Sequence, residues 1–200
     1  DWDVGTGSYS LQNGTLNAGV VQVGLGGTGT FEMSGGNLNI TSYELQLGYF
    51  NNSKGSFTQT GGAVSGGNLA LGIEGGSYGK YELSDPLSIN PSLKTVYSTI
   101  GRGGAGEFVQ QGGSHVVSED LDMGVDAGAW GSYRLVNGYL ETNKTRLAWD
   151  ATGAGSPSGY GGYFVQEGGT HKVNSDLVVA NNPNSTGRYE LKDGTLEVAG

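Results

Sequence analysis

A ten-residue pattern returns eight times along this 200-residue chain. Its copies read G-x-[YF]-x-[LQM]-x-x-G-x-L or a close variant, as in GSYSLQNGTL at residues 7–16 and GRYELKDGTL at residues 187–196. The copies recur on average every ~26 residues and fill the chain, so we expect one repeat domain over residues 1–200 and no separate cap or anchor domain. The aromatic residues at the third position are Tyr9, Phe31, Phe57, Tyr81, Phe108, Tyr133, Phe164 and Tyr189.

Within each copy, apolar and polar residues alternate over three to five positions between Gly, Asn and Ser. This period of two indicates short strands joined by tight turns. A third short run ends in glycine, as at residues 45–48 and 69–72. Glycine fills 40 of the 200 positions. Each one in a helix interior costs about 1 kcal/mol relative to alanine, so the composition works against helix.

Three short strands per repeat predict an all-β chain: a single parallel β-helix, or β-solenoid, of about eight coils without helix. One coil cannot bury its apolar face alone, whereas stacked coils form a continuous core and pair one another's backbone groups. A β-propeller blade needs roughly 40–45 residues, which is longer than the repeat observed here.

The pattern, followed by a turn and L-x-L-G, resembles the β-helix repeat of bacterial autotransporter passengers and of PEP-CTERM-sorted surface proteins. The resemblance covers essentially the whole chain. It implies a parallel β-helix that is exported to the bacterial cell surface, and it implies no particular activity.

The charge balance and the cysteine count restrict the expected partners and cofactors. Nineteen acidic and ten basic residues give a net charge of −9. Nucleic acid and anionic membranes need clustered Lys and Arg, so neither is expected as a partner. No apolar stretch is long enough to span a membrane. Cysteine is absent, which excludes disulfides and thiolate metal sites.

Polar residues occupy several positions that the repeat assigns to the interior. His115 and His171 each lie seven residues after their phenylalanine, where other copies carry Leu or Val. A buried Gln–His pair would suit a metal or catalytic site. The two copies lie roughly 10 Å apart by strand spacing, too far to share an ion, and no carboxylate shares the position. We therefore predict an internal polar ladder and no cofactor; its members are Gln59, Gln110, Gln166, His115 and His171.

Acidic residues cluster at Glu119, Asp120, Asp122 and Asp126. Alignment on the third strand places Arg146 in one column between Asp120 and Asp176. We expect an outward-facing charge ladder rather than a metal site.

Departures from the repeat mark where a solenoid carries its binding surface. The longest lie at residues 85–94 and 149–161. Trp130, Trp149 and Tyr160 are candidate contacts for a sugar ring, and packing within the core or a turn is the alternative for them.

The two ends of the chain suggest an assembly. Trp2 and Val4 match the third-strand motif at residues 21–24, whereas the chain stops after Leu196 and Val198, where a third strand should begin. Either the chain is a piece of a longer array, or one copy's first strand completes the last coil of the next copy.

These features together predict a non-enzymatic extracellular structural protein, a rod segment that binds copies of itself head to tail as a surface filament or stalk. Two alternatives remain: a carbohydrate-active or carbohydrate-binding β-helix that contacts surface polysaccharide, and a passenger-type adhesin.

Overall fold

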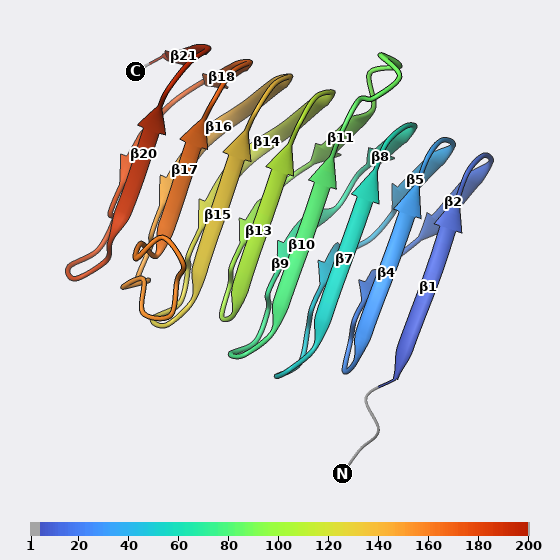
Figure 1. Ribbon diagram of the computed structural model, residues 1–200, viewed down its shortest axis with the longest axis horizontal. Helices are drawn as coiled ribbons and strands as arrows, with labels where there is room; N and C mark the ends of the chain where they lie inside the picture. Colours follow the sequence, from blue (N-terminus) through green and yellow to red (C-terminus); the bar gives the residue numbers. More distant parts are fainter. Residues whose placement is uncertain (1–4, 200) are drawn as a thin grey trace.

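The computed structural model describes residues 5–199, which form a β-solenoid of about eight coils with 21 strands and no helix (Figure 1). This confirms the predicted fold class. Successive coils lie side by side along one axis, and the strand pairs between them in residues 5–199 are parallel. We number the coils one to eight from the N-terminal end, each with one of the eight aromatic residues of the repeat.

The first sheet takes one strand from each coil. Adjacent strands of this sheet pair in register, with Tyr9 opposite Phe31 and Phe164 opposite Tyr189. In order, the strands are β1 (Thr6–Leu11), β4 (Thr28–Met33), β7 (Lys54–Gln59), β10 (Tyr78–Leu83), β13 (Ala105–Gln110), β15 (Trp130–Leu135), β17 (Gly162–Gln166) and β20 (Gly187–Leu191).

The remaining strands form the other walls of the solenoid. The second strands of the coils are β2 (Thr15–Ala18), β5 (Asn37–Ile40), β8 (Ala63–Ser65), β11 (Ser92–Thr95), β18 (Thr170–Val173) and β21 (Thr195–Val198). The third strands are β3 (Val21–Val23), β6 (Glu44–Leu47), β9 (Asn68–Leu71), β12 (Ser98–Ile100) and β19 (Leu177–Val179).

Coils five and six depart from the expected three strands. In each, the second and third strands form one long strand, β14 (Ser114–Met123) and β16 (Tyr139–Leu147). The register of this pair shifts between Val117 and Asp120. A β-bulge therefore forms the corner at which the other coils have a break between their second and third strands.

The core runs the length of the solenoid. Aromatic residues of the first sheet form one interior column, in which the rings from Phe31 to Tyr189 stack at 4.5–5.0 Å between centroids. Leu and Val from the opposite wall pack against this column, and Leu38, Leu93 and Leu140 are fully buried. Such stacking adds to the burial of apolar area that stabilises neighbouring coils.

A column of glycines lies on the inner side of the first sheet, two residues before each aromatic residue. At Gly79 a β-carbon would lie within 3 Å of the backbone of Leu47 and Gly72. From Gly29 to Gly187 the column therefore needs glycine, because the end of a third strand passes directly against these positions.

Gly5, the first described residue, does not lie where the alignment of residues 2–5 with residues 21–24 places it. The carbonyl of Gly5 accepts a hydrogen bond from the amide of Thr28 at 2.9 Å, which places Gly5 opposite Gly27 rather than opposite Gly24. Trp2 and Val4 lie outside the described residues. Within residues 5–199 there is no helix of the length and apolarity that a membrane span requires.

Candidate functional site

The interior polar residues form a continuous hydrogen-bonded chain between coils five and six. The hydroxyl of Tyr133 donates to Oε1 of Gln110 at 2.6 Å. The amide nitrogen of Gln110 in turn donates to the carbonyls of Gly113 and Tyr139, at 3.2 and 3.0 Å. The glutamine thus joins a turn of its own coil to the first residue of the second strand in the next coil.

His115 extends this chain across the core. Its Nδ1 lies 3.1 Å from the Tyr133 hydroxyl, and its Nε2 lies 3.3 Å from the hydroxyl of Ser98. Because Tyr133 already donates to Gln110, its oxygen accepts from Nδ1–H, and Nε2 accepts from Ser98. Ser98 then accepts from Thr95, 2.9 Å away. When the histidine is neutral, every side chain in this run of hydrogen bonds, from Gln110 to Thr95, has a hydrogen-bond partner.

Coils seven and eight repeat the arrangement. Gln166, Tyr189 and His171 are joined as their counterparts are, and Thr145 and Thr142 take the places of Ser98 and Thr95. Coils three and four carry a shorter version, in which Tyr81 donates to Gln59 at 2.6 Å. A valine fills the histidine position there.

All five predicted members of the polar ladder are fully buried: Gln59, Gln110, Gln166, His115 and His171. Sequence reasoning placed them inside but missed the hydroxyl groups that connect them. A signal was present, because Ser98 and Thr145 replace leucine in the inward column one coil before each histidine. Each histidine also stacks on its own phenylalanine, at 4.8 Å for His115 and 4.9 Å for His171.

Burial sets the protonation state of both histidines. Desolvation lowers the pKa of His115 to about 3, with a smaller contribution from His171, and lowers the pKa of His171 to about 3. Both rings are therefore neutral near pH 7. Among residues 5–199, no group of three or more His, Asp and Glu side chains is placed to hold a metal ion.

These histidines predict a loss of stability in acid. An unfolded histidine binds a proton below about pH 6.5, whereas the folded rings do so only near pH 3. Stability therefore falls as the pH falls through that window, with a slope approaching about 1.4 kcal/mol per pH unit for each histidine. Urea unfolding at pH 7 and pH 4.5 measures the change. The double variant His115→Leu/His171→Leu should lose less stability between the two pH values; an equal loss would contradict the assignment.

The acidic cluster lies on the outer side of its strand, as the predicted ladder requires, because Asp120 and Asp122 alternate with the buried Leu121 and Met123. Asp120 and Asp122 are only 20% and 17% exposed, and both contact Arg146, at 2.7 and 2.6 Å. The predicted column was wrong in one place: Lys144, not Arg146, lies opposite Asp120 and pairs with Asp176 at 2.8 Å. Glu119 and Asp126 are exposed, as an outward strip requires.

The three candidate sugar contacts do not lie together. Trp149 packs under the guanidinium of Arg146, 4.4 Å from its ring centroid. Trp130 and Tyr160 instead line one groove on the outer face of the first sheet.

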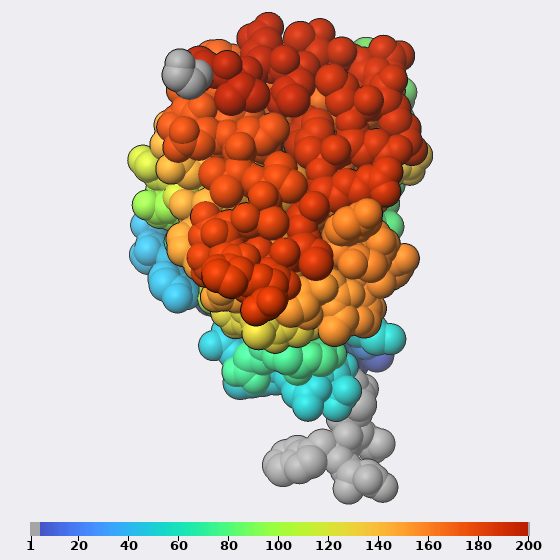
Figure 2. All heavy atoms as spheres, turned by 90° about the vertical axis from the view of Figure 1, so that its left-hand side faces the viewer, coloured from blue at the N-terminus to red at the C-terminus, as the bar shows by residue number. Residues whose placement is uncertain are grey.

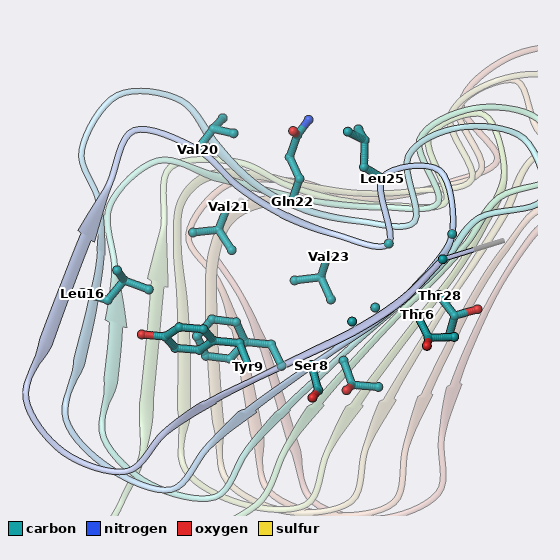
Figure 3. A pocket seen from close by; sticks show the side chains of 17 residues that line it. Thr6, Ser8, Tyr9, Leu16, Val20, Val21, Gln22, Val23, Leu25 and Thr28 are labelled. Atoms are coloured by element: carbon teal, nitrogen blue, oxygen red, sulfur yellow. The ribbon is translucent and has the colours of Figure 1, made fainter. Parts of the chain in front are cut away.

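The first coil opens onto its own interior (Figure 3). The side chains of Tyr9, Leu16, Val21 and Val23 point into the coil, around a hollow of about 480 Å³. Tyr9 is 47% exposed although the equivalent rings in the middle of the solenoid are buried. Among the described residues, β1, β2 and β3 each pair along one edge only, with β4, β5 and β6.

The last coil presents a matching surface, onto which Figure 2 looks directly. Leu191 and Val198 are 49% and 45% exposed there. Tyr189 and Leu196 are partly buried beside them. Within the described part of the chain, β20 and β21 pair only with β17 and β18.

No protein-family model, curated protein or solved structure matches this chain. Two surface features stand out among the described residues: the end coils and the groove beside Trp130. They differ in chemistry, because the end coils expose apolar side chains and strand edges, whereas the groove combines aromatic, charged and hydroxyl groups.

Proposed function

We propose that this chain is a non-enzymatic structural rod whose end coils pair with those of a second copy, head to tail, in a filament or stalk on the bacterial surface. The observation that carries the proposal is that, within residues 5–199, both end coils expose interior apolar side chains and strand edges that pair on one side only. The resemblance of the repeat to exported β-helix proteins supports the location.

The two end coils are complementary column by column. Continuing the pairing register places Tyr9 of one copy on Tyr189 of the next, and Leu16 on Leu196. The edges of β1 and β2 would add to those of β20 and β21, so backbone hydrogen bonds cross the joint as they cross each internal interface. Because the two surfaces are different, the contact does not close on itself and propagates along the axis.

One position sets the strength of this joint. Inside the solenoid, Tyr81, Tyr133 and Tyr189 each donate to a glutamine in the preceding coil. At the joint the equivalent position holds Leu191, so the hydroxyl of Tyr9 meets no glutamine. A glutamine there would find its other partners in place, the carbonyls of Gly194 and of Thr15 in the next copy, by analogy with Gln166.

Electron microscopy of the purified chain at increasing concentration tests the proposal. Single copies should be rods about 38 Å long, from eight coils at the usual strand spacing, and should join into longer rods. Leu191→Gln should lengthen them at a given concentration. Val198→Lys should shorten them, because it places a charge in the apolar joint.

Val96→Lys is the matched control, since Val96 is similarly exposed but lies in the middle of the rod. It should leave the length distribution unchanged. Single short rods at every concentration, for both the unmodified chain and Leu191→Gln, would overturn the proposal.

A further inference from the structure

A groove of about 400 Å³ lies on the outer face of the first sheet, beneath residues 152–161 of the loop that joins β16 to β17. This loop is the orange segment that folds over the sheet beside β15 and β17 in Figure 1. The volume falls within the roughly 300–1,000 Å³ of small-molecule sites. The groove is lined by Glu107, Trp130 and Ser132 from the sheet, by Tyr163 and Arg188 from the next two coils, and by Tyr160 from the loop.

The loop that covers the groove is held by its own hydrogen bonds and by the last coil. The hydroxyl of Thr186 donates to the carbonyl of Thr152 at 2.7 Å, and the amide of Gly161 donates to the carbonyl of Thr186 at 2.8 Å. At the tip, the hydroxyls of Ser156 and Ser158 lie 2.9 Å apart. Both serines line the groove. The loop therefore supplies a preformed wall that carries two serine hydroxyl groups.

A network fixes the aromatic side of the groove. The hydroxyl of Tyr163 donates to Glu190 at 2.7 Å, and Arg188 pairs with the same carboxylate at 3.3 Å. The guanidinium of Arg188 also lies over the ring of Tyr160, 5.6 Å from its centroid. The rings of Tyr160 and Tyr163 are 6.0 Å apart with 22° between their planes. These contacts hold two ring faces at the groove before any ligand binds.

Glu107 supplies the negative charge on the opposite side. Among residues 5–199 it is the only carboxylate that lines the groove, and it has no salt-bridge partner there. Tyr78 lies beside it: burial raises the pKa of Tyr78 first, and the charge of Glu107 raises it further. The carboxylate of Glu107 can accept hydrogen bonds from a ligand in the groove that it lines.

This combination selects one class of ligand. A cationic ligand is disfavoured because the positive charge of Arg188 already lines the groove, and an anionic ligand is disfavoured by the charge of Glu107. A pyranose ring satisfies the site, because its C–H face packs on the aromatic rings while its hydroxyls meet a carboxylate, a guanidinium and serine hydroxyls. We propose that the groove binds a pyranose unit of a neutral polysaccharide.

Isothermal titration calorimetry with neutral hexose and N-acetylhexosamine oligosaccharides, and with hexuronate oligosaccharides, tests this site. At least one neutral oligosaccharide should bind, and Trp130→Ala and Tyr160→Ala should each weaken that binding about tenfold or more. Trp149→Ala is the matched control: it removes an aromatic residue from the same region but outside the groove, and should change the affinity less than about twofold.

Circular dichroism of each variant separates lost binding from lost folding. If Trp130→Ala disturbs the sheet, Tyr160→Ala still tests the groove, because it changes only the loop. Glu107→Gln should keep an acceptor and raise the affinity for hexuronates relative to neutral sugars. Absence of binding by every neutral oligosaccharide at millimolar concentration, binding of hexuronates alone, or an equal loss in Trp149→Ala would each overturn the proposal. The rod proposal would stand in those cases, because its test depends on the end coils.

Discussion

Tyr133→Phe is expected to lower the free energy of unfolding by about 2–6 kcal/mol, although it removes a single oxygen atom. That oxygen serves two buried partners, Oε1 of Gln110 and Nδ1 of His115. Both would remain in a core from which water is excluded, and each unsatisfied polar group costs about 1–3 kcal/mol. Urea unfolding at pH 7, followed by far-ultraviolet circular dichroism, measures the loss.

Tyr81→Phe is the matched control for this prediction. Tyr81 is equally buried and donates to Gln59, but valine stands where coil five has His115, so its hydroxyl serves one partner. The expected loss is about 1–3 kcal/mol. Equal losses in the two variants would show that the histidine contributes nothing through Tyr133.

Gly79→Ala is expected to destabilise the chain by about 3 kcal/mol, at the upper end of the usual cost of overpacking. The new methyl group would meet the backbone of Leu47, Leu71 and Gly72 at less than 3 Å. A flexible side chain could move away, but here the obstacles are backbone atoms held in the neighbouring coil walls. Thermal and urea unfolding of the purified variant measure the effect.

Gly7→Ala tests whether the cost of Gly79→Ala comes from the neighbouring coil. Gly7 occupies the same column in coil one, but no described atom lies within 4 Å of its expected β-carbon. Its replacement should change stability by less than about 0.5 kcal/mol. A comparable loss at both glycines would mean that the effect arises from the strand itself.

The repeat predicted the fold because its period matches one physical unit. An alternation of period two with a returning aromatic residue requires strands that stack in register, and Tyr9 through Tyr189 lie in one column for that reason. The same logic located Gln110 and His115 in the interior, since they occupy positions that other copies give to leucine.

Corners and long loops do not follow from the period. Thr145, rather than leucine, occupies the first inward position of its strand segment, so the apolar pattern misplaced Arg146 by two residues. The groove could not be predicted either, because the path of residues 152–161 depends on contacts with Thr186 in the last coil. Sequence pattern named Trp130 and Tyr160 as sugar contacts, but only the folded loop separates them from Trp149.

From coil three onward, glutamine and tyrosine alternate along the interior, with each Tyr hydroxyl bonded to the glutamine of the coil before it. The backbone repeats every coil, but this side-chain chemistry repeats every second coil. If a folding chain slipped by one coil, the strands would still pair, yet tyrosine and glutamine would each face an apolar neighbour. The alternation therefore raises the free energy of a structure that is misaligned by one coil, which identical strands alone would tolerate.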